Sequence, residues 1–498
     1  MNIKEPAIER VFCFQERLPR KINGIVFETK FWRIKMLCGG LSLRDFMHKL
    51  HKVLRPTGPV VSMELLFGRE KHVTDLELAL YATGRHAFIY GDRGVGKTSL
   101  AQTVAFKLQE ENDPILVGCE KESTFSSVMN DIILRGVPQD KKVDTQGWSI
   151  GLNVAGIGGI NAGKNEKINN TEINIDSVSA AVRALQFLTT VHSKVPYIVI
   201  DEFDQIESEI ERQKFGSLIK QLGDQACEVK LIFTGIGDSL VTLIGGHKSS
   251  ERQIHQVHLD SLPWNGRFQI IDNAFDEFGL SVEESVRYKI AGLSDGFPNY
   301  IHLICEKILL TCQSSMREFD IVDYSLFIKG LNDAIDSVSE TLRQSYTDAT
   351  EGRDESYKHI IWAMSDMADL TRHKTHISES YVKICKSLDV IPLDKSTFER
   401  KFSALKKPAF GCIIIPALGN RPAWFRFREN MLRGYIRMRA EQHGLELDFQ
   451  NYRVAGEHSA RAIGKYAAYK PLTNVEGRVA KLRGDDDWLE DLKSELRK

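Results

Sequence analysis

The fold is decided by the stretch His86-Ala87-Phe88-Ile89-Tyr90-Gly91-Asp92-Arg93-Gly94-Val95-Gly96-Lys97-Thr98. Its first five residues form a short apolar run, which predicts a buried parallel strand. Gly91, four further residues and then Gly96-Lys97-Thr98 match the phosphate-binding loop pattern in full. Its glycines let backbone amides wrap phosphates, and the helix expected from Lys97 adds the partial positive charge of its N-terminus. The residues expected to bind the nucleotide here are Gly91, Asp92, Arg93, Gly94, Val95, Gly96, Lys97, Thr98 and Ser99.

Apolar runs and helical patterns alternate on both sides of this loop. Such alternation predicts an α/β fold with a parallel sheet, of the kind built around phosphate-binding loops. We expect Lys97 to reach the β- and γ-phosphates of ATP and Thr98 to ligate Mg²⁺. The expected strands are 86–90, 114–119, 195–200 and 229–233, and the expected helices are 72–83, 97–109 and one beginning at Asp176.

Two carboxylates close the strand pattern Tyr197-Ile198-Val199-Ile200-Asp201-Glu202. At the C-terminal end of a parallel strand, Asp201 would face the same crevice as the phosphate-binding loop. We expect Asp201 to hold Mg²⁺, directly or through water, and Glu202 to orient and polarise the attacking water. Thr234 ends the next strand, and its hydroxyl is expected to bond the γ-phosphate or that water. This arrangement predicts ATP hydrolysis.

In this order, the motifs resemble a known family. Phe67-Gly68-Arg69-Glu70, the loop at Gly91, Ile200-Asp201-Glu202 and Phe233-Thr234-Gly235 are similar to the AAA+ ATPases of the origin-recognition initiator type. They are equally similar to the STAND-type signalling and defence NTPases. The resemblance covers roughly residues 61–312, and more loosely extends to Arg439.

The resemblance implies roles for residues outside the loop. Phe67, Gly68 and Arg69 would line the base pocket. Arg252, before the strand-like segment 254–259, would be an arginine finger that reaches the γ-phosphate of a neighbouring subunit. Pro298 would contact the nucleotide from a helical lid.

The lid departs from the initiator pattern. Many AAA+ proteins carry Gly-x-x-Arg at the position of Gly296-Phe297-Pro298-Asn299, so Asn299 stands in the place of an arginine that touches nucleotide. The Gly-x-Pro form resembles the STAND-type lid. This departure favours a nucleotide-controlled switch over a replication initiator.

The C-terminal third resembles a winged helix-turn-helix domain. A helix at 397–405, strands at 410–416 and 423–427, and a closing helix at 430–439 follow one another. Between residues 398 and 439 there are ten basic and two acidic residues, a local net charge of +8. Such a surface suits DNA, although similar modules in STAND-type proteins contact protein.

Composition restricts the remaining possibilities. The net charge of −1 gives the whole chain no overall preference for nucleic acid. Eight cysteines without a Cys-x-x-Cys pair argue against a zinc site or a disulfide framework. No run of about 18 apolar residues and no apolar signal core are present, so we expect a cytoplasmic protein without a membrane span.

These observations predict five regions and one leading function. The function is a Mg-ATP-hydrolysing switch or motor that forms ATP-dependent homo-oligomers and assembles on DNA through 398–439 or recruits an effector protein. Bacterial defence is the context that the STAND resemblance implies. A non-hydrolysing, ATP-dependent binding or scaffold module and a DNA-loading, initiator-like protein are the alternatives. The regions are an N-terminal segment (1–60), an ATPase core (61–265, with an insertion at 138–175), a helical lid (266–340), a winged-helix-like domain (341–439) and a charged tail (440–498).

Overall fold

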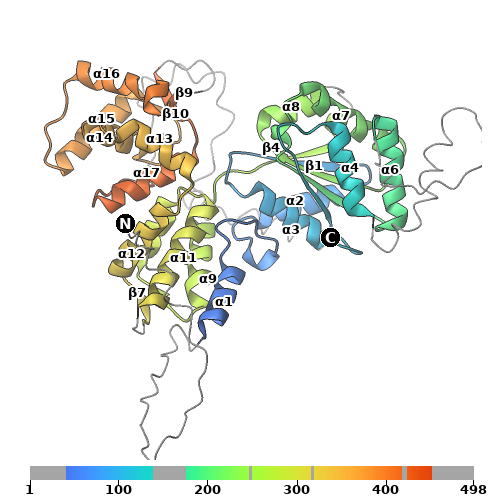
Figure 1. The fold of residues 1–498 in the computed structure, drawn as a ribbon, viewed down its shortest axis with the longest axis horizontal. Helices are drawn as coiled ribbons and strands as arrows, with labels where there is room; N and C mark the ends of the chain where they lie inside the picture. Colours follow the sequence, from blue (N-terminus) through green and yellow to red (C-terminus); the bar gives the residue numbers. More distant parts are fainter. Residues whose placement is uncertain (1–40, 138–174, 246–249, 316–318, 418–422, 451–498) are drawn as a thin grey trace, which may run out of the picture.

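The computed structural model describes residues 41–137, 175–245, 250–315, 319–417 and 423–450. Apart from Ile175, the expected insertion lies outside the described residues, as does the tail beyond Gln450. Figure 1 shows two lobes, one built around a large sheet and the other built mainly of helices. We call the first, residues 61–258, the sheet domain. The division of the chain into five regions stays a prediction.

The sheet domain contains five parallel strands in the order β2-β3-β4-β1-β5, which confirms the expected α/β fold. The expected strands lie within a few residues of their predicted bounds. The strands are β1 (His86–Tyr90), β2 (Ile115–Gly118), β3 (Tyr197–Asp201), β4 (Lys230–Gly235) and β5 (Ile254–His258).

Alternate residues of each strand bury opposite faces of the sheet, as the period of two requires. In β1, Ala87 and Ile89 pack with the first two helices of this domain, whereas Phe88 packs with the helices on the other face. Both faces of the inner strands are therefore covered, which explains why these strands are mostly apolar, whereas the edge strand Ile254–His258 exposes Gln256 and His258. The helices are α2 (Glu70–Tyr81), α3 (Lys97–Leu108), α4 (Phe125–Gly136), α6 (Val178–Val191), α7 (Glu209–Asp224) and α8 (Gly237–Gly245).

The helices after β5 form the region that the sequence predicts as a lid, and we keep that name for them; α1 (Leu43–Val53) packs beside these helices. The ring centroids of Phe46 in α1 and Phe278 after α9 lie 5.1 Å apart. The segment 1–60 was expected as a separate region, but its helix lies with the lid in Figure 1. The lid helices are α9 (Trp264–Asp276), α10 (Glu284–Leu293), α11 (Pro298–Ser314) and α12 (Tyr324–Asp336), with a two-stranded sheet of β6 (Ser281–Val282) and β7 (Ile321–Val322).

The C-terminal helices and strands form a winged helix, which confirms the sequence-based expectation. Strand β10 pairs antiparallel with both β8 and β9, and Phe402 packs on Phe425 of β10 with ring centroids 4.9 Å apart. The elements of this winged-helix unit are α13 (Glu340–Thr350), α14 (Ser356–Ser365), β8 (Arg372–His373), α15 (Lys374–Ser387), α16 (Lys395–Ala404), β9 (Ile414–Pro416) and β10 (Trp424–Phe427), followed by the closing helix α17 (Met431–Gln442).

Two expectations about the C-terminal third need revision. The local charge of +8 overstates the exposed charge, because Arg433 and Arg437 are 3% and 1% exposed and bond other groups of the protein. The charged tail was expected from Ala440 onward, yet α17 continues to Gln442 and Phe449 is buried against the lid. Among the described residues, none of the helices has the length and apolar character needed to cross a membrane.

Candidate nucleotide-binding and hydrolysis site

The phosphate-binding loop connects β1 to α3 at the carboxyl edge of the sheet. Gly94 and Gly96 have φ angles of 82° and 97°, a region that residues with a Cβ rarely adopt. Two strand-end bonds hold the start of the loop. Leu259 N donates to Tyr90 O at 2.7 Å, and Gly91 N donates to the carbonyl of Gly235 at 3.4 Å. The loop thus lies at a fixed place between a strand end and a helix N-terminus.

Lys97 lies at the mouth of this loop. Its Nζ donates to the carbonyls of Gly91 and Asp92, at 3.0 and 2.9 Å. Burial lowers the pKa of Lys97, while Asp204 and Asp201 oppose this effect. Among the described residues, the hydrogen-bond partners of the ammonium group are these two backbone oxygens, and a phosphate would be a stronger partner.

Thr98 and Asp201 meet across the crevice, as expected from the sequence. Thr98 Oγ1 donates to both carboxylate oxygens of Asp201, at 3.0 and 2.9 Å. Mg²⁺ prefers oxygen ligands and takes one or two protein oxygens together with phosphates and water. A hydroxyl and a carboxylate side by side at the loop fit such an ion, so these two residues would hold it.

Glu202 and Thr234 are positioned together. Glu202 has a φ of 53°, an uncommon backbone conformation for a residue with a side chain. Its amide donates to Thr234 Oγ1 at 3.1 Å, and that hydroxyl in turn donates to an oxygen of Asp201. Thr234 therefore forms hydrogen bonds with both acidic residues, with the carboxylate of Asp201 and with the amide of Glu202. The sequence predicts a contact of its hydroxyl with phosphate or water. That phosphate contact stays a prediction.

The segment Phe67–Arg69, which is expected to line the base pocket, contacts the phosphate-binding loop through Arg69. Arg69 is 4% exposed, and its Nη2 donates to Val95 O at 3.0 Å and to Asp260 O at 2.6 Å. Burial lowers the pKa of Arg69 to about 10. Phe67 is partly buried beside the core, and Gly68 packs closely on Gly266. A contact of these residues with the base stays a prediction.

The lid reaches the loop through Pro298, the first residue of α11. A Cβ placed on Gly96 would lie 3.9 Å from Pro298 Cγ. Asn299, which stands where the family pattern has an arginine, donates from its side chain to Pro56 O. Asn299 therefore ties the lid to the chain segment that follows α1.

The start of α17 also lies on the phosphate-binding loop. No sequence motif predicts this contact. Asn430 Nδ2 donates to Asp92 Oδ2 at 2.7 Å. A Cβ placed on Gly94 would lie 2.5 Å from Met431 Sδ, so this side chain covers the loop closely. Tyr300 Oη of the lid donates to Met431 O at 2.9 Å. The lid and the closing helix thus meet the phosphate-binding loop together.

Arg252 lies far from this constellation along the sheet. It is exposed in a 3-10 turn, Ser250–Gln253, directly before β5. Parallel strands all begin at one edge, so this turn is at the amino edge while the loop is at the carboxyl edge. Arg252 is therefore not part of the nucleotide site of its own chain.

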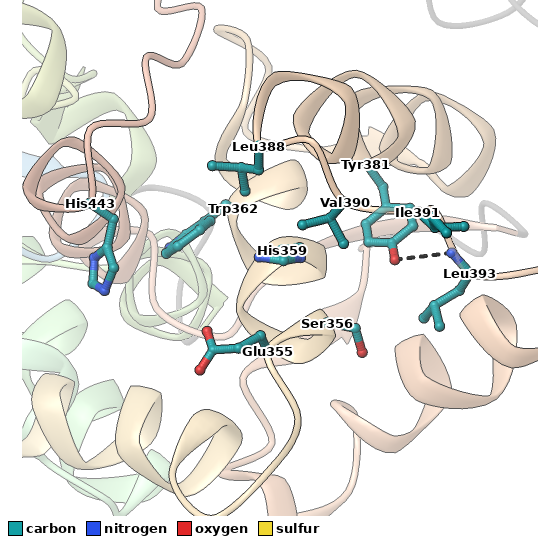
Figure 2. Close-up of a pocket in the computed structure, with 10 residues that line it drawn as sticks. All are labelled: Glu355, Ser356, His359, Trp362, Tyr381, Leu388, Val390, Ile391, Leu393 and His443. Carbon is teal, nitrogen blue, oxygen red and sulfur yellow. Dashed lines mark hydrogen bonds between the residues drawn. The ribbon is translucent and has the colours of Figure 1, made fainter.

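A separate hollow of about 460 Å³ lies in the winged-helix unit. Figure 2 shows His359 and Trp362 of α14 beside the loop that follows α15, where Tyr381 Oη accepts from Leu393 N at 3.3 Å. Ile391 on its rim is 90% exposed. The residues that line the hollow are Glu355, Ser356, His359, Trp362, Tyr381, Leu388, Val390, Ile391, Leu393 and His443.

Several solved structures are similar to this chain. The Walker-type ATPase of Pyrococcus abyssi is 16% identical, with a TM-score of 0.45, over 76% of this chain and 99% of that one. The ORC2 protein of Aeropyrum pernix is 13% identical, with a TM-score of 0.42, over 79% and 98%. The ORC1 protein of the same organism, in complex with DNA, is 14% identical, with a TM-score of 0.40, over 76% and 94%. No curated protein matches.

Part of the sheet domain matches a known family model. Residues 65–231 match the family model described as "AAA ATPase domain". This range contains the phosphate-binding loop, Asp201 and Glu202, which the structure brings to one edge of the sheet. Residues 65–231 are therefore similar to an AAA ATPase domain.

Proposed function

We propose that this protein hydrolyses Mg-ATP and acts as a nucleotide-controlled switch. The observation that carries the proposal is the seat of α17 on the phosphate-binding loop, where Asn430 bonds Asp92 and Met431 covers Gly94. A helix outside the ATPase domain thereby touches the residues that would wrap the phosphates. Its position would respond to what the loop holds.

The chemistry would be shared among the residues at the sheet edge. Lys97 and the loop amides would neutralise the phosphates, and Thr98 with Asp201 would hold Mg²⁺, which supplies charge stabilisation at the transferring phosphoryl group. Glu202 would orient the attacking water and accept its proton. Thr234 would keep Asp201 and Glu202 in register.

The switch follows from competition for space. Met431 Sδ lies where a methyl on Gly94 would already collide, so the described arrangement leaves little room beside this part of the loop. Phosphates that fill the loop would displace the start of α17, and Tyr300 would transmit the displacement to the lid through its bond to Met431 O. The output would be assembly or recruitment of an effector, in a defence setting by analogy with STAND-type proteins.

The Glu202→Gln variant tests hydrolysis. We expect it to bind ATP as the wild type does and to turn it over at least about a hundredfold more slowly, because general-base assistance contributes ~10²–10⁴-fold. Glu228→Gln, an exposed carboxylate at the amino edge, is the matched control. If the wild type does not hydrolyse ATP faster than Glu202→Gln, either with or without DNA, the protein is a non-hydrolysing, ATP-dependent binding module.

DNA binding is a second candidate function, which the exposed face of α16 favours. Ser396, Arg400 and Ser403 of α16 recur at helical spacing and are exposed, opposite the buried Phe398, and the exposed Lys407 follows shortly after the helix. Hydroxyl and cationic side chains on one helix face suit phosphates and base edges. We propose this face, rather than the whole basic range 398–439, as the DNA contact.

Charge reversal tests this face. Arg400→Glu with Lys407→Glu should abolish salt-sensitive binding to duplex DNA, while Lys71→Glu, at an exposed position of α2, should leave it intact. Equal binding by all three proteins would exclude the α16 face. No binding by the wild type at low salt would favour effector recruitment through protein contact.

A further inference from the structure

The lid and α17 are joined by a buried ionic network. Asp295, in the turn between α10 and α11, is 4% exposed and accepts from Arg433 Nε at 2.6 Å, from Arg433 Nη2 and from Arg437 Nη1 at 3.0 Å. The same guanidinium groups donate to carbonyls at the C-terminal end of α14 and in the turn that follows it. Those acceptors are Ser365, Met367, Ala368 and Asp369. Asp295 thus joins the lid to α17, and Arg433 and Arg437 join α17 to the winged-helix unit.

Close packing surrounds this network. A Cβ placed on Gly434 would lie 2.7 Å from Tyr300 of the lid, so α17 and α11 touch at van der Waals distance. Lys289 Nζ of α10 lies 2.8 Å from Glu441 Oε1 of α17. Phe449 packs on Gly292. These contacts leave little freedom between the lid and the winged-helix unit.

Helix α1 belongs to the same body. Phe46 packs on Phe278, and Lys49 Nζ lies 3.3 Å from Glu277 Oε2. Asn299 holds the carbonyl of Pro56 just beyond the helix. In Figure 1, α1 lies beside α9 and α11, in the lobe opposite the sheet.

Among the described residues, two short connecting segments, which we call joints, link this body to the sheet domain. On one side of the first joint, Pro56 is bonded to the lid, and on the other, Val60 N donates to Ser99 Oγ of α3 at 3.1 Å. Only Thr57, Gly58 and Pro59 lie between them, and a Cβ on Gly58 would meet nothing within 4 Å.

The second joint is equally short. Leu259 N donates to Tyr90 O of the sheet domain, whereas Leu262 N donates to Gly296 O of the lid at 2.8 Å. Ser261 and Asp260, whose carbonyl also accepts from Arg69 of the sheet domain, lie between these two anchors. Close by, a Cβ on Gly68 would lie 2.9 Å from Gly266 Cα, so the two bodies touch there backbone to backbone.

From this geometry we propose that the lid, α1 and the winged-helix unit move as one body, locked by Asp295, Arg433 and Arg437. The body turns relative to the sheet domain at Thr57–Pro59 and Asp260–Ser261, beside the Gly68–Gly266 contact. Asn430 and Met431 leave the phosphate-binding loop in the course of that turn. This inference rests on the proposed nucleotide-controlled switch and names the part that moves.

Three distances in the full-length protein test the proposal. Spectroscopic labels are attached to unnatural amino acids at the exposed positions Glu122 in the sheet domain, Ser314 in the lid and Ser403 in the winged-helix unit. A non-hydrolysed ATP analogue with Mg²⁺ should shift the 122–314 and 122–403 distances together. The 314–403 distance should keep its value and its width.

Failure of the inference and failure of the switch give different results. A 314–403 distance that changes as much as the other two overturns the single body and leaves the switch standing. If calorimetry shows that the analogue binds and none of the three distances changes, the switch itself is overturned, and the inference with it.

A variant tests the lock. Arg433→Gln should broaden the 314–403 distance distribution, while Arg439→Gln, on the same helix but stacked on Tyr346 outside the network, should not. A folded Arg433→Gln protein with a wild-type 314–403 distribution overturns the role of the lock. If Arg433→Gln does not fold, the three wild-type distances still decide the proposal.

Discussion

At the scale of single residues, the acidic centre is held by hydroxyl groups. Asp201 accepts from Thr98 and Thr234, and Thr234 also accepts from the amide of Glu202. Glu202 keeps an uncommon backbone conformation with a φ of 53°, and such a conformation persists only where neighbouring bonds fix it. The hydrogen bond from the Glu202 amide to the hydroxyl of Thr234 is one of those bonds.

Replacement of Thr234 by valine should therefore slow hydrolysis more than it weakens binding. Valine has the same shape but cannot bond Asp201 or the Glu202 amide, so we expect kcat to fall by about 10- to 100-fold, within the range of lost positioning effects. The Kd for Mg-ATP should change little, because Lys97 and the loop amides remain. Steady-state kinetics with calorimetric binding measures both, and Thr234→Ser, which restores the hydroxyl, should recover kcat. A serine variant as slow as the valine variant would contradict this role.

Two buried histidines should make the fold sensitive to acid. Burial lowers the pKa of His302 to about 4, and burial together with the charge of Lys230 lowers that of His86 to about 3. The unfolded chain protonates histidine near pH 6.5, so this contribution to stability is fully present above pH 6.5 and is lost as the pH falls below it.

The His302→Leu variant should lose less stability in acid than the wild type. A difference of about 2.5 pKa units corresponds to about 3 kcal/mol at pH 4. Urea unfolding of both proteins at pH 7.5, 5.5 and 4 measures this difference. His359→Leu, a histidine in α14 with a smaller expected effect, is the control. Parallel pH profiles for wild type and His302→Leu would show that His302 does not carry the effect.

At the scale of elements, the sequence predicted those strands and helix starts that depend on neighbouring residues in the chain. The apolar run at His86 predicted β1, and the loop glycines with Lys97 predicted where α3 begins. Asp201 and Thr98 could be paired in advance because the carboxyl ends of parallel strands share an edge. The close approach of these two residues agrees with that expectation.

The position of α17 could not be predicted in the same way. Asn430 meets Asp92 across 338 residues of sequence, and no periodicity reports so distant a contact. Arg433 and Arg437 were counted as surface charge because arginines are usually exposed, but Asp295 and several carbonyls hold them in the interior. The revised charge of the winged-helix unit follows from this tertiary contact.

Met431 should restrain nucleotide binding. Shortening it to alanine frees the space beside Gly94, so Met431→Ala should bind Mg-ATP several-fold more tightly, with a correspondingly lower Kd, provided that the start of α17 competes with the phosphates. Calorimetry measures the change. Met438→Ala, a buried methionine of the same helix away from the loop, is the matched control. Equal Kd values for Met431→Ala and the wild type would mean that α17 does not compete.

At the scale of the whole molecule, Arg252 can act only between subunits. It is exposed at the amino edge of the sheet, opposite its own phosphate-binding loop, so a role in hydrolysis requires a neighbouring chain. Arg252→Ala should therefore lower turnover without changing ATP affinity. An arginine finger is worth ~10³–10⁵ in rate, so even partial replacement by other groups leaves a loss of at least about a hundredfold.

Mixing two inactive variants gives the sharpest test of this arrangement. Glu202→Gln subunits lack the general base but keep Arg252, whereas Arg252→Ala subunits keep Glu202, so a mixed assembly contains interfaces at which both groups are intact. ATPase activity should reappear on mixing and should rise with total protein concentration, because assembly is a mass-action process. Sedimentation with a slowly hydrolysed ATP analogue should show the larger species that the activity requires. A mixture no more active than its components, although sedimentation shows co-assembly, would exclude Arg252 as a group acting in trans.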